Sequence, residues 1–344
     1  MNTAQLLVTG CYDKEMDGRG TGLTSYRRDP GDGSLTPLDT LALPSPSYVV
    51  RHPTQPLLYT ANEAGEVGSV SVVAVAADGS LREVERLSSQ GGWPCHLAVG
   101  EGGRRLAVAN YRTGTALFLD LDEAGRPVGG ARLWAGDAGA LGPRADRQDG
   151  PHAHMVVPGP DGLWTVVDLG TDQLRSGRAD ADGPEAVTAL PAGTGPRQLV
   201  RAADGMAYVV GELDSRLHVL REAEPGRFRW LGAVPATGEP ERTAGNLPAH
   251  LTVSADGSLL LLSNRVTDTV ALFRTRPDGL PRPVGEVPSG GAWPRHMELV
   301  GDHLHVCDER TDTLAVFTLD VANATLTLRH RYATGSPTCA LAIG

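Results

Sequence analysis

The side chains best suited to acid–base and anion-binding chemistry stand in short, recurring phrases of this chain. Arg197 follows a Gly-Pro pair, Glu212 comes a short stretch later, and His152 and His154 form a His-x-His segment. Glu212 or a neutral His154 could take a proton from water. Arg197 could hold a carboxylate or a developing oxyanion through paired hydrogen bonds. We therefore expect Glu212, His154 and Arg197 to be catalytic.

A second set of residues is expected to bind an anionic small-molecule substrate. Lys14 is the only lysine in the chain, which leaves arginine as the side chain for binding anions. For the histidines the alternative is a structural role, in which each ring bonds the backbone of a neighbouring repeat. The candidate substrate-binding residues are His152, Arg265, Arg295, His96, His250 and His296.

Other kinds of chemistry find little support. A single lysine disfavours Schiff-base catalysis, and no serine or cysteine stands in a nucleophile elbow. His152 and His154 could share one face of a strand and bind a metal, but no suitably spaced carboxylate pair completes the set. The net charge of −10 and a pI near 5.5 argue against nucleic acid and anionic membranes as partners. We expect neither a metal nor a cofactor.

The elements that must position these residues are indicated by a phrase that occurs seven times. Successive copies begin 43 to 58 residues apart, a period typical of β-propellers and related arrays. Many copies read Pro-x-His followed by apolar residues. The copies begin at Pro46, Pro94, His152, Pro196, Pro248, Pro294 and Pro337.

A second phrase, built around Asn, Asp or Glu, follows the first. The interval is 14 residues in five copies, for example from Tyr48 to Asn62 and from Gln198 to Glu212. Such an interval fits two short strands joined by a turn. Two further strand-like runs follow in each repeat. We therefore predict an all-β fold: one domain over residues 1–344, a seven-bladed β-propeller with four antiparallel strands per blade.

The two ends of the chain predict how the ring closes. Residues 338–343 form an inner strand with no partner after it, and residues 5–9 form a second strand with no first. N-terminal strands that pair with the C-terminal strand would complete a seventh blade and remove exposed sheet edges. The expected blades span about 46–92, 93–149, 150–194, 195–246, 247–291, 292–335, and 336–344 together with 5–43.

This topology also predicts where the site lies. The first strand of each blade would start at one face of the ring, and the second strand would end at the same face. The Pro-x-His phrase and the phrase built around Asn, Asp or Glu would therefore meet around the mouth of the central channel. In this alignment Glu212 replaces the Asn or Asp of other repeats. One column of the alignment holds His96, His154, His250 and His296.

Two connections on that face are longer than the rest. Residues 136–150 carry Arg144 and Arg147, and residues 236–247 contain Gly, Glu and Arg. Long loops on one rim of a rigid ring usually build pockets, so we expect a substrate lid here. A cluster of arginines at the mouth would suit a phosphorylated substrate.

These residues carry a resemblance to a known family. The phrases Asp149-Gly150-Pro151-His152-Ala153-His154, Gly195-Pro196-Arg197, Gly211-Glu212 and Ser263-Asn264-Arg265 resemble the lactonase family of seven-bladed propellers. That family includes propeller-type 6-phosphogluconolactonases and carboxymuconate cycloisomerases. The resemblance implies a site that opens or closes a lactone without a required metal, built from His152 or His154, Arg197, Glu212 and Arg265. Where the family commonly has a histidine, this chain has Gln198, which cannot shuttle a proton near neutral pH.

Three functions are compatible with this pattern. The favoured one is a hydrolase of a sugar-acid lactone, similar to 6-phosphogluconolactonase. The alternatives are an intramolecular lyase or cycloisomerase acting on a carboxylated small molecule, and a non-catalytic binding propeller. Because no basic start followed by an apolar stretch opens the sequence, we expect a cytoplasmic location. A closed ring of this kind is expected to stand as a monomer.

Overall fold

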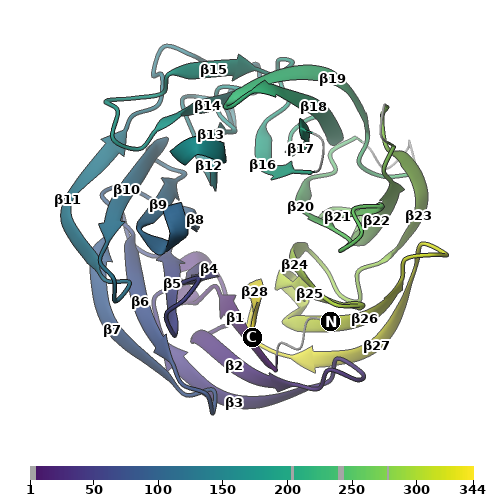
Figure 1. Ribbon diagram of the computed structural model, residues 1–344. Coiled ribbons are helices and arrows are strands. Elements are labelled where there is room, and N and C mark those ends of the chain that lie inside the picture. Colours follow the sequence, from purple (N-terminus) through teal and green to yellow (C-terminus); the bar gives the residue numbers. More distant parts are fainter. Residues whose placement is uncertain (1–4, 203–204, 239–243, 277–278) are drawn as a thin grey trace.

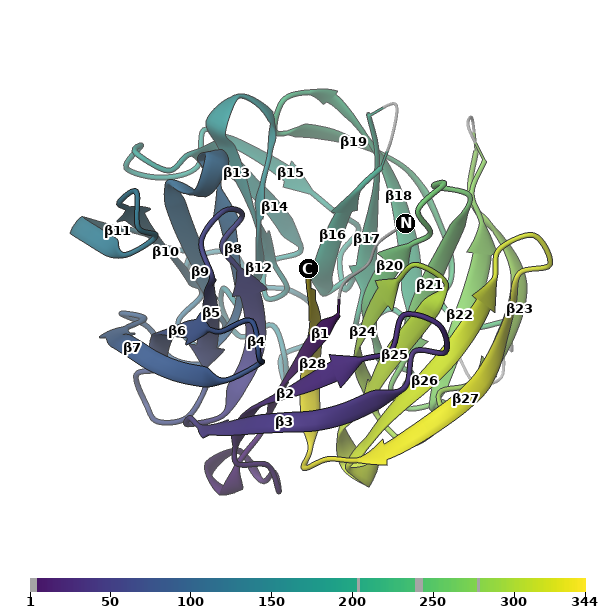
Figure 2. The same cartoon turned by 60° about the horizontal axis from the view of Figure 1, so that its bottom comes forward.

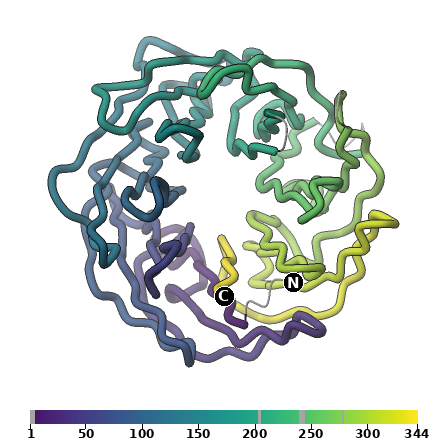
Figure 3. The backbone as a smooth tube through the Cα atoms, in the orientation of Figure 1, coloured from purple at the N-terminus to yellow at the C-terminus, as the bar shows by residue number. Residues whose placement is uncertain are grey.

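The chain forms a closed ring of β-sheets in a computed structural model that describes residues 5–202, 205–238, 244–276 and 279–344. Its strands make seven four-stranded antiparallel sheets. These sheets stand as blades around one central axis (Figure 1), and the backbone trace follows the same ring (Figure 3). The expected all-β, seven-bladed propeller is confirmed.

Blades 1 to 4 follow one another along the chain, each from its innermost to its outermost strand. Blade 1 consists of β4 (Pro46–Arg51), β5 (Leu57–Asn62), β6 (Ser69–Val75) and β7 (Leu81–Ser88). Blade 2 consists of β8 (Pro94–Gly100), β9 (Arg105–Asn110), β10 (Thr115–Leu121) and β11 (Pro127–Trp134). Blade 3 consists of β12 (Ala153–Pro158), β13 (Leu163–Asp168), β14 (Gln173–Arg178) and β15 (Ala186–Ala189). Blade 4 consists of β16 (Pro196–Arg201), β17 (Met206–Gly211), β18 (Arg216–Glu224) and β19 (Arg227–Pro235).

Blades 5 and 6 repeat this order, and blade 7 joins the two ends of the chain. Blade 5 consists of β20 (Pro248–Val253), β21 (Leu259–Asn264), β22 (Thr269–Arg274) and β23 (Arg282–Pro288). Blade 6 consists of β24 (Pro294–Val300), β25 (His303–Asp308), β26 (Thr313–Asp320) and β27 (Thr325–Ala333). Blade 7 consists of β28 (Pro337–Ile343), β1 (Leu6–Cys11), β2 (Gly22–Arg28) and β3 (Leu35–Ala42).

Helical structure in the described residues is limited to short 3₁₀ turns. None of the described helices is long and apolar enough to cross a membrane. The turns span Lys14–Met16, Glu101–Gly103, Pro160–Gly162 and Glu309–Thr311.

The position of a strand in its blade decides its pattern of burial. Every residue of the second strands β5, β17, β21 and β25 is buried. Both faces of these strands are covered by neighbouring blades, and β5, β17 and β21 therefore contain near-continuous apolar runs rather than an alternating pattern. In the outer strand β3 only the first residue is buried and the others are half-buried or exposed, because one face of the strand meets solvent.

The core consists of seven clusters of buried apolar side chains in the described residues, one between each pair of adjacent blades. Between blades 1 and 2, for example, Leu57 and Tyr59 pack with Leu97 and Leu106. Each blade is therefore stabilised by its two neighbours, and the blades position the channel residues together.

Blade 7 closes the ring as predicted. Strand β28 pairs with β1 in an antiparallel register that sets Ile343 opposite Leu6 and Leu341 opposite Val8. Figure 2 shows the two strands side by side near the centre of the molecule. The closing strand therefore takes the innermost place in its blade, the place that faces the channel.

Candidate active site

The first strand of each blade has a β-bulge at its second residue, and this bulge shapes the channel. In blade 4, Pro196 pairs with Gly211 and Gln198 with Val210, which leaves Arg197 as the extra residue. The first strands of the other six blades shift register at the same place. The bulge changes the direction of one side chain. As a result, two successive residues line the channel in each of blades 1 to 6, and Thr338 lines it in blade 7.

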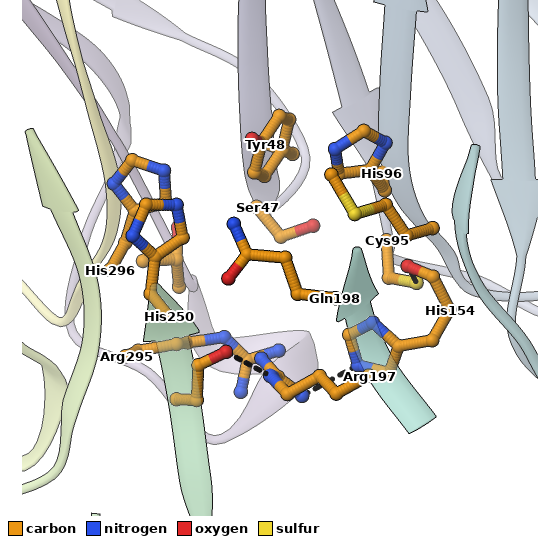
Figure 4. A pocket seen from close by; sticks show the side chains of 13 residues that line it. Ser47, Tyr48, Cys95, His96, His154, Arg197, Gln198, His250, Arg295 and His296 are labelled. Carbon is orange, nitrogen blue, oxygen red and sulfur yellow. Dashed lines mark hydrogen bonds between the residues drawn. The ribbon is translucent and has the colours of Figure 1, made fainter. Parts of the chain in front are cut away.

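These residues form two stacked rings. The upper channel ring, nearer the mouth, holds the bulged residues Ser47, Cys95, His154, Arg197, Ala249, Arg295 and Thr338. The lower channel ring holds the residues that follow them, Tyr48, His96, Met155, Gln198, His250, His296 and Cys339. Figure 4 shows side chains of both rings around the channel.

A third ring, the mouth ring, follows the ends of the second strands. Each member donates its backbone N–H, over 2.9 to 3.2 Å, to the carbonyl just before the first strand of its own blade. This shared hydrogen bond shows that the seven positions are equivalent. The mouth ring holds Tyr12, Glu63, Tyr111, Leu169, Glu212, Arg265 and Glu309.

The rings correct two alignments made from the sequence. His154 was expected to share a column with His96, but Ala153 pairs with Asp168 and Met155 with Val167, so His154 belongs to the upper channel ring beside Arg197. Glu212 was expected to replace an Asn or Asp. Gly211 takes that place, and Glu212 occupies the next position, in the mouth ring. The cause is that blades 3 and 4 are one residue shorter between these points than blade 1.

The histidines of the lower channel ring bond neighbouring blades. His96 Nδ1 accepts the N–H of Val156 at 3.5 Å, and His296 Nδ1 accepts that of Ala340 at 3.3 Å. Burial lowers the pKa of both rings to about 3, so both are neutral. These contacts favour the structural alternative for His96 and His296 over the predicted substrate-binding role.

His250 and Gln198 also belong to the lower channel ring. Gln198 accepts the N–H of Leu251 at 2.6 Å and donates to its carbonyl at 3.2 Å. Gln198 is thus a bridge between blades 4 and 5, which fits the absence of a titratable group there. The Nδ1 atom of His250 has no hydrogen-bond partner among the described residues, and its ring lies 3.9 Å from that of His296.

Glu212 is the anionic centre of the mouth. It is 1% exposed, and its carboxylate contacts Arg147 at 2.6 Å, Arg197 at 2.8 Å and Arg265 at 2.8 Å. Burial alone would raise the pKa of Glu212, but the three guanidinium groups outweigh it and hold the pKa well below its usual range. Glu212 is therefore permanently ionised, and its main effect is to hold three arginines in place.

Arg197 links this centre to His154. Its Nη1 atom donates to Glu212 and to Nε2 of His154, the latter at 2.5 Å, and its Nε atom donates to the carbonyl of Ala249 at 3.0 Å. Burial, and next the charge of Arg197, lowers the pKa of His154 well below its usual range. His154 is therefore a neutral imidazole whose proton resides on Nδ1, since Nε2 accepts. Figure 4 shows Arg197 beside His154.

Arg265 and His152 have different surroundings. Arg265 lies 5.3 Å above the ring of Trp293 and donates to the carbonyl of Leu247, and burial lowers its pKa to about 9, so it stays charged at neutral pH. His152 stands just before β12 and stacks on Tyr111 at 4.7 Å. Its nitrogens lie 3.0 Å from the carbonyl of Tyr111 and 2.9 Å from Asp149, so His152 supports the wall of the mouth from behind.

Arg295 organises the opposite side of the mouth. Its guanidinium donates to Tyr12 at 2.5 Å and to Glu309 at 3.3 Å, and it lies 4.0 Å from Glu63. Glu63 is 4% exposed, and its Oε2 atom has no hydrogen-bond partner among the described residues. Burial raises the pKa of Glu63, against the charge of Arg295 and hydrogen bonds with Tyr12 and Ser47.

The mouth is a hollow that opens to solvent, and its empty space, open solvent included, is about 630 Å³. Trp93 and Tyr111 provide an aromatic wall, with parallel rings 6.5 Å apart. Trp93 is 37% exposed and holds a positive φ of 55°, a strained backbone of the kind concentrated at functional sites. The lining residues are Tyr12, Met16, Glu63, Trp93, Cys95, Tyr111, Arg147, His154, Arg197, Glu212, Arg265 and Arg295.

The longer of the two predicted lid loops contributes a fixed side chain. Arg147 reaches Glu212 and the hydroxyl of Tyr111. The next residue, Gln148, is 1% exposed and bonds Leu169 and Asp172, which anchors the loop. Arg144, also considered for the arginine cluster, instead pairs with Asp146 at the surface. In the second loop, residues 239–243 lie outside the described residues.

Several mouth residues were missed as site candidates. Glu63, Tyr12, Trp93 and Tyr111 line the mouth but were not among the candidates from the sequence. The repeated Trp-Pro pairs before two first strands, at Trp93 and Trp293, were a readable signal for aromatic residues at the mouth. No group of three or more His, Cys, Asp or Glu side chains suited to a metal comes together in the described part of the chain.

The chain belongs to a family of known fold: the model described as "Lactonase, 7-bladed beta-propeller" matches residues 6–342. Two solved structures are similar over nearly the whole chain. The periplasmic gluconolactonase PpgL of Pseudomonas aeruginosa has a TM-score of 0.89 and 26% identity, covering 98% of this chain and 99% of its own. A Bacteroides fragilis protein provisionally assigned as a 6-phosphogluconolactonase has a TM-score of 0.89 and 25% identity, covering 100% and 99%.

Curated relatives extend the same similarity. An uncharacterised protein of Staphylococcus epidermidis is 28% identical over 341 residues, which is 94% of this chain and 95% of the relative. A protein of Lactococcus lactis, also uncharacterised, is 27% identical over 336 residues. The chain is therefore a lactonase-family propeller whose structural neighbours are 6-phosphogluconolactonase-like.

Proposed function

We propose that this protein hydrolyses a sugar-acid lactone that carries a negative charge, as a phosphate or carboxylate, at the channel mouth. The observation that carries the proposal is the mouth itself. Arg147, Arg197 and Arg265 surround the single carboxylate of Glu212, which leaves a surplus of positive charge beside an open hollow. Such a surplus attracts an anionic substrate and stabilises the oxyanion that forms when water attacks a lactone carbonyl.

The relatives support the same reaction class. One similar structure is a periplasmic gluconolactonase, and another is provisionally assigned as a 6-phosphogluconolactonase; both descriptions denote lactone hydrolases. The arginines are fixed by Glu212 and by backbone carbonyls before substrate arrives, so little reorganisation is needed at the moment of reaction. No comparable observation favours the lyase or cycloisomerase alternative, and none favours the non-catalytic binding propeller.

The test is a proton-release assay on γ- and δ-aldonolactones, each with and without a phosphate group, after subtraction of spontaneous hydrolysis. We expect turnover, with a higher kcat/KM for the phosphorylated lactones. Replacing Arg197 with Met removes one oxyanion donor and should lower kcat by roughly 100-fold or more.

Arg86→Met is the matched control. Arg86 is an exposed side chain that pairs with Glu83 on β7, the outermost strand of blade 1, whereas the mouth lies at the centre of the ring. This variant should leave kcat within about twofold of wild type, as surface pairs contribute little. No turnover of any lactone by the wild-type protein would refute the proposal. Unsaturated carboxylic acids would then be the substrates to examine for the reverse, cyclising reaction.

A further inference from the structure

The mouth holds two buried carboxyl groups on different blades, and they differ in the number of arginines that contact them. Glu212, on blade 4, is fully engaged by three arginines. Glu63, on blade 1, occupies the equivalent position of the mouth ring, as its backbone bond to Ser45 shows. Glu63 lines the same hollow. Its buried Oε2 atom lies 4.0 Å from Arg295 and has no hydrogen-bond partner among the described residues.

An unpartnered, buried carboxyl oxygen is costly unless the site uses it. The groups that offer hydrolytic chemistry elsewhere in the mouth are engaged. Glu212 is held ionised by its arginines, and the Nε2 atom of His154 accepts a hydrogen bond from Arg197. A base that is held so far below its usual pKa has little tendency to take a proton from water.

We propose that Glu63 is the proton-transfer residue of the lactone reaction, an inference that rests on the hydrolase function proposed above. The carboxylate of Glu63 takes a proton from the attacking water as the water oxygen bonds to the carbonyl carbon. The ring C–O bond then breaks, and the protonated Glu63 returns the proton to the departing ring oxygen. One water is consumed, the hydroxy acid is formed, and Glu63 ends in its starting state.

The surroundings of Glu63 suit this cycle. Arg295 lies 4.0 Å away and donates to Tyr12 and Glu309, so its charge is shared among several acceptors rather than held by Glu63 alone. The other titratable or charged groups that act on Glu63 are Tyr12 and Arg197, and the thiol of Cys95 lies in its field. Burial raises the pKa of Glu63, which brings it nearer the operating pH, where a general base is most effective.

The experiment is the pH dependence of kcat/KM for whichever lactone the wild-type protein turns over. Wild type should lose activity as the pH falls through a value above the ordinary glutamate pKa of about 4.3. Glu63→Gln keeps the shape of the side chain but cannot exchange protons. It should lower kcat by about 100-fold to 10,000-fold and remove this acid limb. Glu63→Asp should keep the limb, with a smaller loss of kcat.

Glu298→Gln is the matched control. Glu298 is another buried carboxyl with a raised pKa, but it bonds the backbone of Ala342 and does not line the mouth. This variant should keep the wild-type pH profile. Folding of each variant is checked by thermal unfolding before kinetics, and infrared titration of the carboxyl band, wild type against Glu63→Gln, reports the raised pKa without substrate.

The outcomes separate the two proposals. Wild-type turnover with an unchanged kcat or an intact acid limb in Glu63→Gln would overturn the role of Glu63 and leave the hydrolase function standing. The role of Glu63 would also be overturned if neither wild type nor Glu63→Gln lost kcat/KM at low pH. Inactivity of the wild type on every lactone would refute the hydrolase function, and the role of Glu63 with it.

Discussion

Glu212 and Glu63 line one hollow in opposite electrostatic surroundings. Three guanidinium groups hold the pKa of Glu212 well below its usual range, whereas burial raises the pKa of Glu63. Environments that push two carboxyl groups apart in this way commonly separate a charge-stabilising role from a proton-transfer role. At the scale of single residues, the site is therefore defined by how each side chain is partnered, not by its type alone.

The role assigned to Glu212 predicts a loss of both stability and activity in Glu212→Gln. The amide keeps the shape of the side chain but leaves three partly buried arginines without their carboxylate. Breaking such a buried network should cost about 3 kcal/mol, which lowers the Tm by roughly 4 °C for a chain of this length. Calorimetry and the lactone assay measure the two effects.

The control for that prediction is Glu224→Gln. Glu224 pairs with Arg227 at 3.6 Å, and both side chains are exposed, so loss of the pair should change stability by less than about 1 kcal/mol. If Glu212→Gln has a wild-type Tm, the arginines do not depend on Glu212, and its description as the anchor of the mouth is wrong.

At the scale of elements, the β-bulges explain how much of the site could be predicted from the sequence. The blades were predictable because strand length, turn residues and the apolar pattern repeat locally. His154, Arg197, Glu212 and Arg265 were correctly expected to meet at one mouth. Their ring positions were not predictable by counting, because Pro196 pairs with Gly211 across 15 residues whereas Pro46 pairs with Asn62 across 16.

The contacts between mouth side chains were the other part of the site that the sequence repeats could not predict. Arg147 and Tyr12 come from connections between strands, and no repeat pattern places such segments. Likewise, the sequence gives no indication that Glu212 contacts three arginines while Glu63 lies 4.0 Å from one, with no hydrogen bond to its Oε2 atom among the described residues, since this depends on contacts between distant blades. The identity of the mouth residues was thus partly predictable, but the division of work between them was not.

The contact between β24 and the closing strand β28 gives a prediction at this scale. Glu298 accepts the N–H of Ala342 at 3.0 Å, and burial raises its pKa to about 7. The folded protein therefore favours the protonated form. The stability that this form contributes is fully present below the unfolded pKa of about 4.3 and is lost as the pH rises through about 7.

Glu298→Gln keeps the acceptor but cannot ionise. Its Tm should match that of wild type near the unfolded pKa of about 4.3, exceed it increasingly as the pH rises toward about 7, and keep a constant excess above that pH. Thermal unfolding at a series of pH values measures the difference. Asp256→Asn serves as the control, because hydrogen bonds from Ser254 and Ser258 lower the pKa of Asp256 to about 2 and its effect should not vary over this range. A pH-independent difference for Glu298→Gln would contradict the prediction.

At the scale of the whole molecule, the ring is stabilised by interfaces that each involve two blades. Seven apolar clusters alternate with seven blades in the described residues, so loss of one blade would expose two clusters. Blade 7 is distinctive because its innermost strand, β28, and its other three strands come from opposite ends of the chain. The site depends on this closure, since Tyr12 and Thr338 belong to blade 7.

Removing residues 337–344 should therefore abolish cooperative folding. Strand β28 is mostly buried, and its loss exposes the edge of β1. This loss also removes Ala340 and Ala342 from one adjacent apolar cluster and Cys339 from the other. A circular permutant tests whether the strand itself, rather than its place in the chain, is what matters. In it, a short Gly-Ser linker joins Gly344 to Gln5, and new ends open at the exposed turn between Ala322 and Asn323.

The permutant should keep a Tm within a few degrees of wild type, because β28 and β1 become one local hairpin and only the mostly exposed outer strand β27 is relocated. The truncated chain should show no cooperative thermal transition and should aggregate. Circular dichroism and size-exclusion chromatography distinguish the two. Cooperative unfolding of the truncated chain near the wild-type Tm would mean that six blades and three strands suffice, and closure would then serve the mouth rather than the fold.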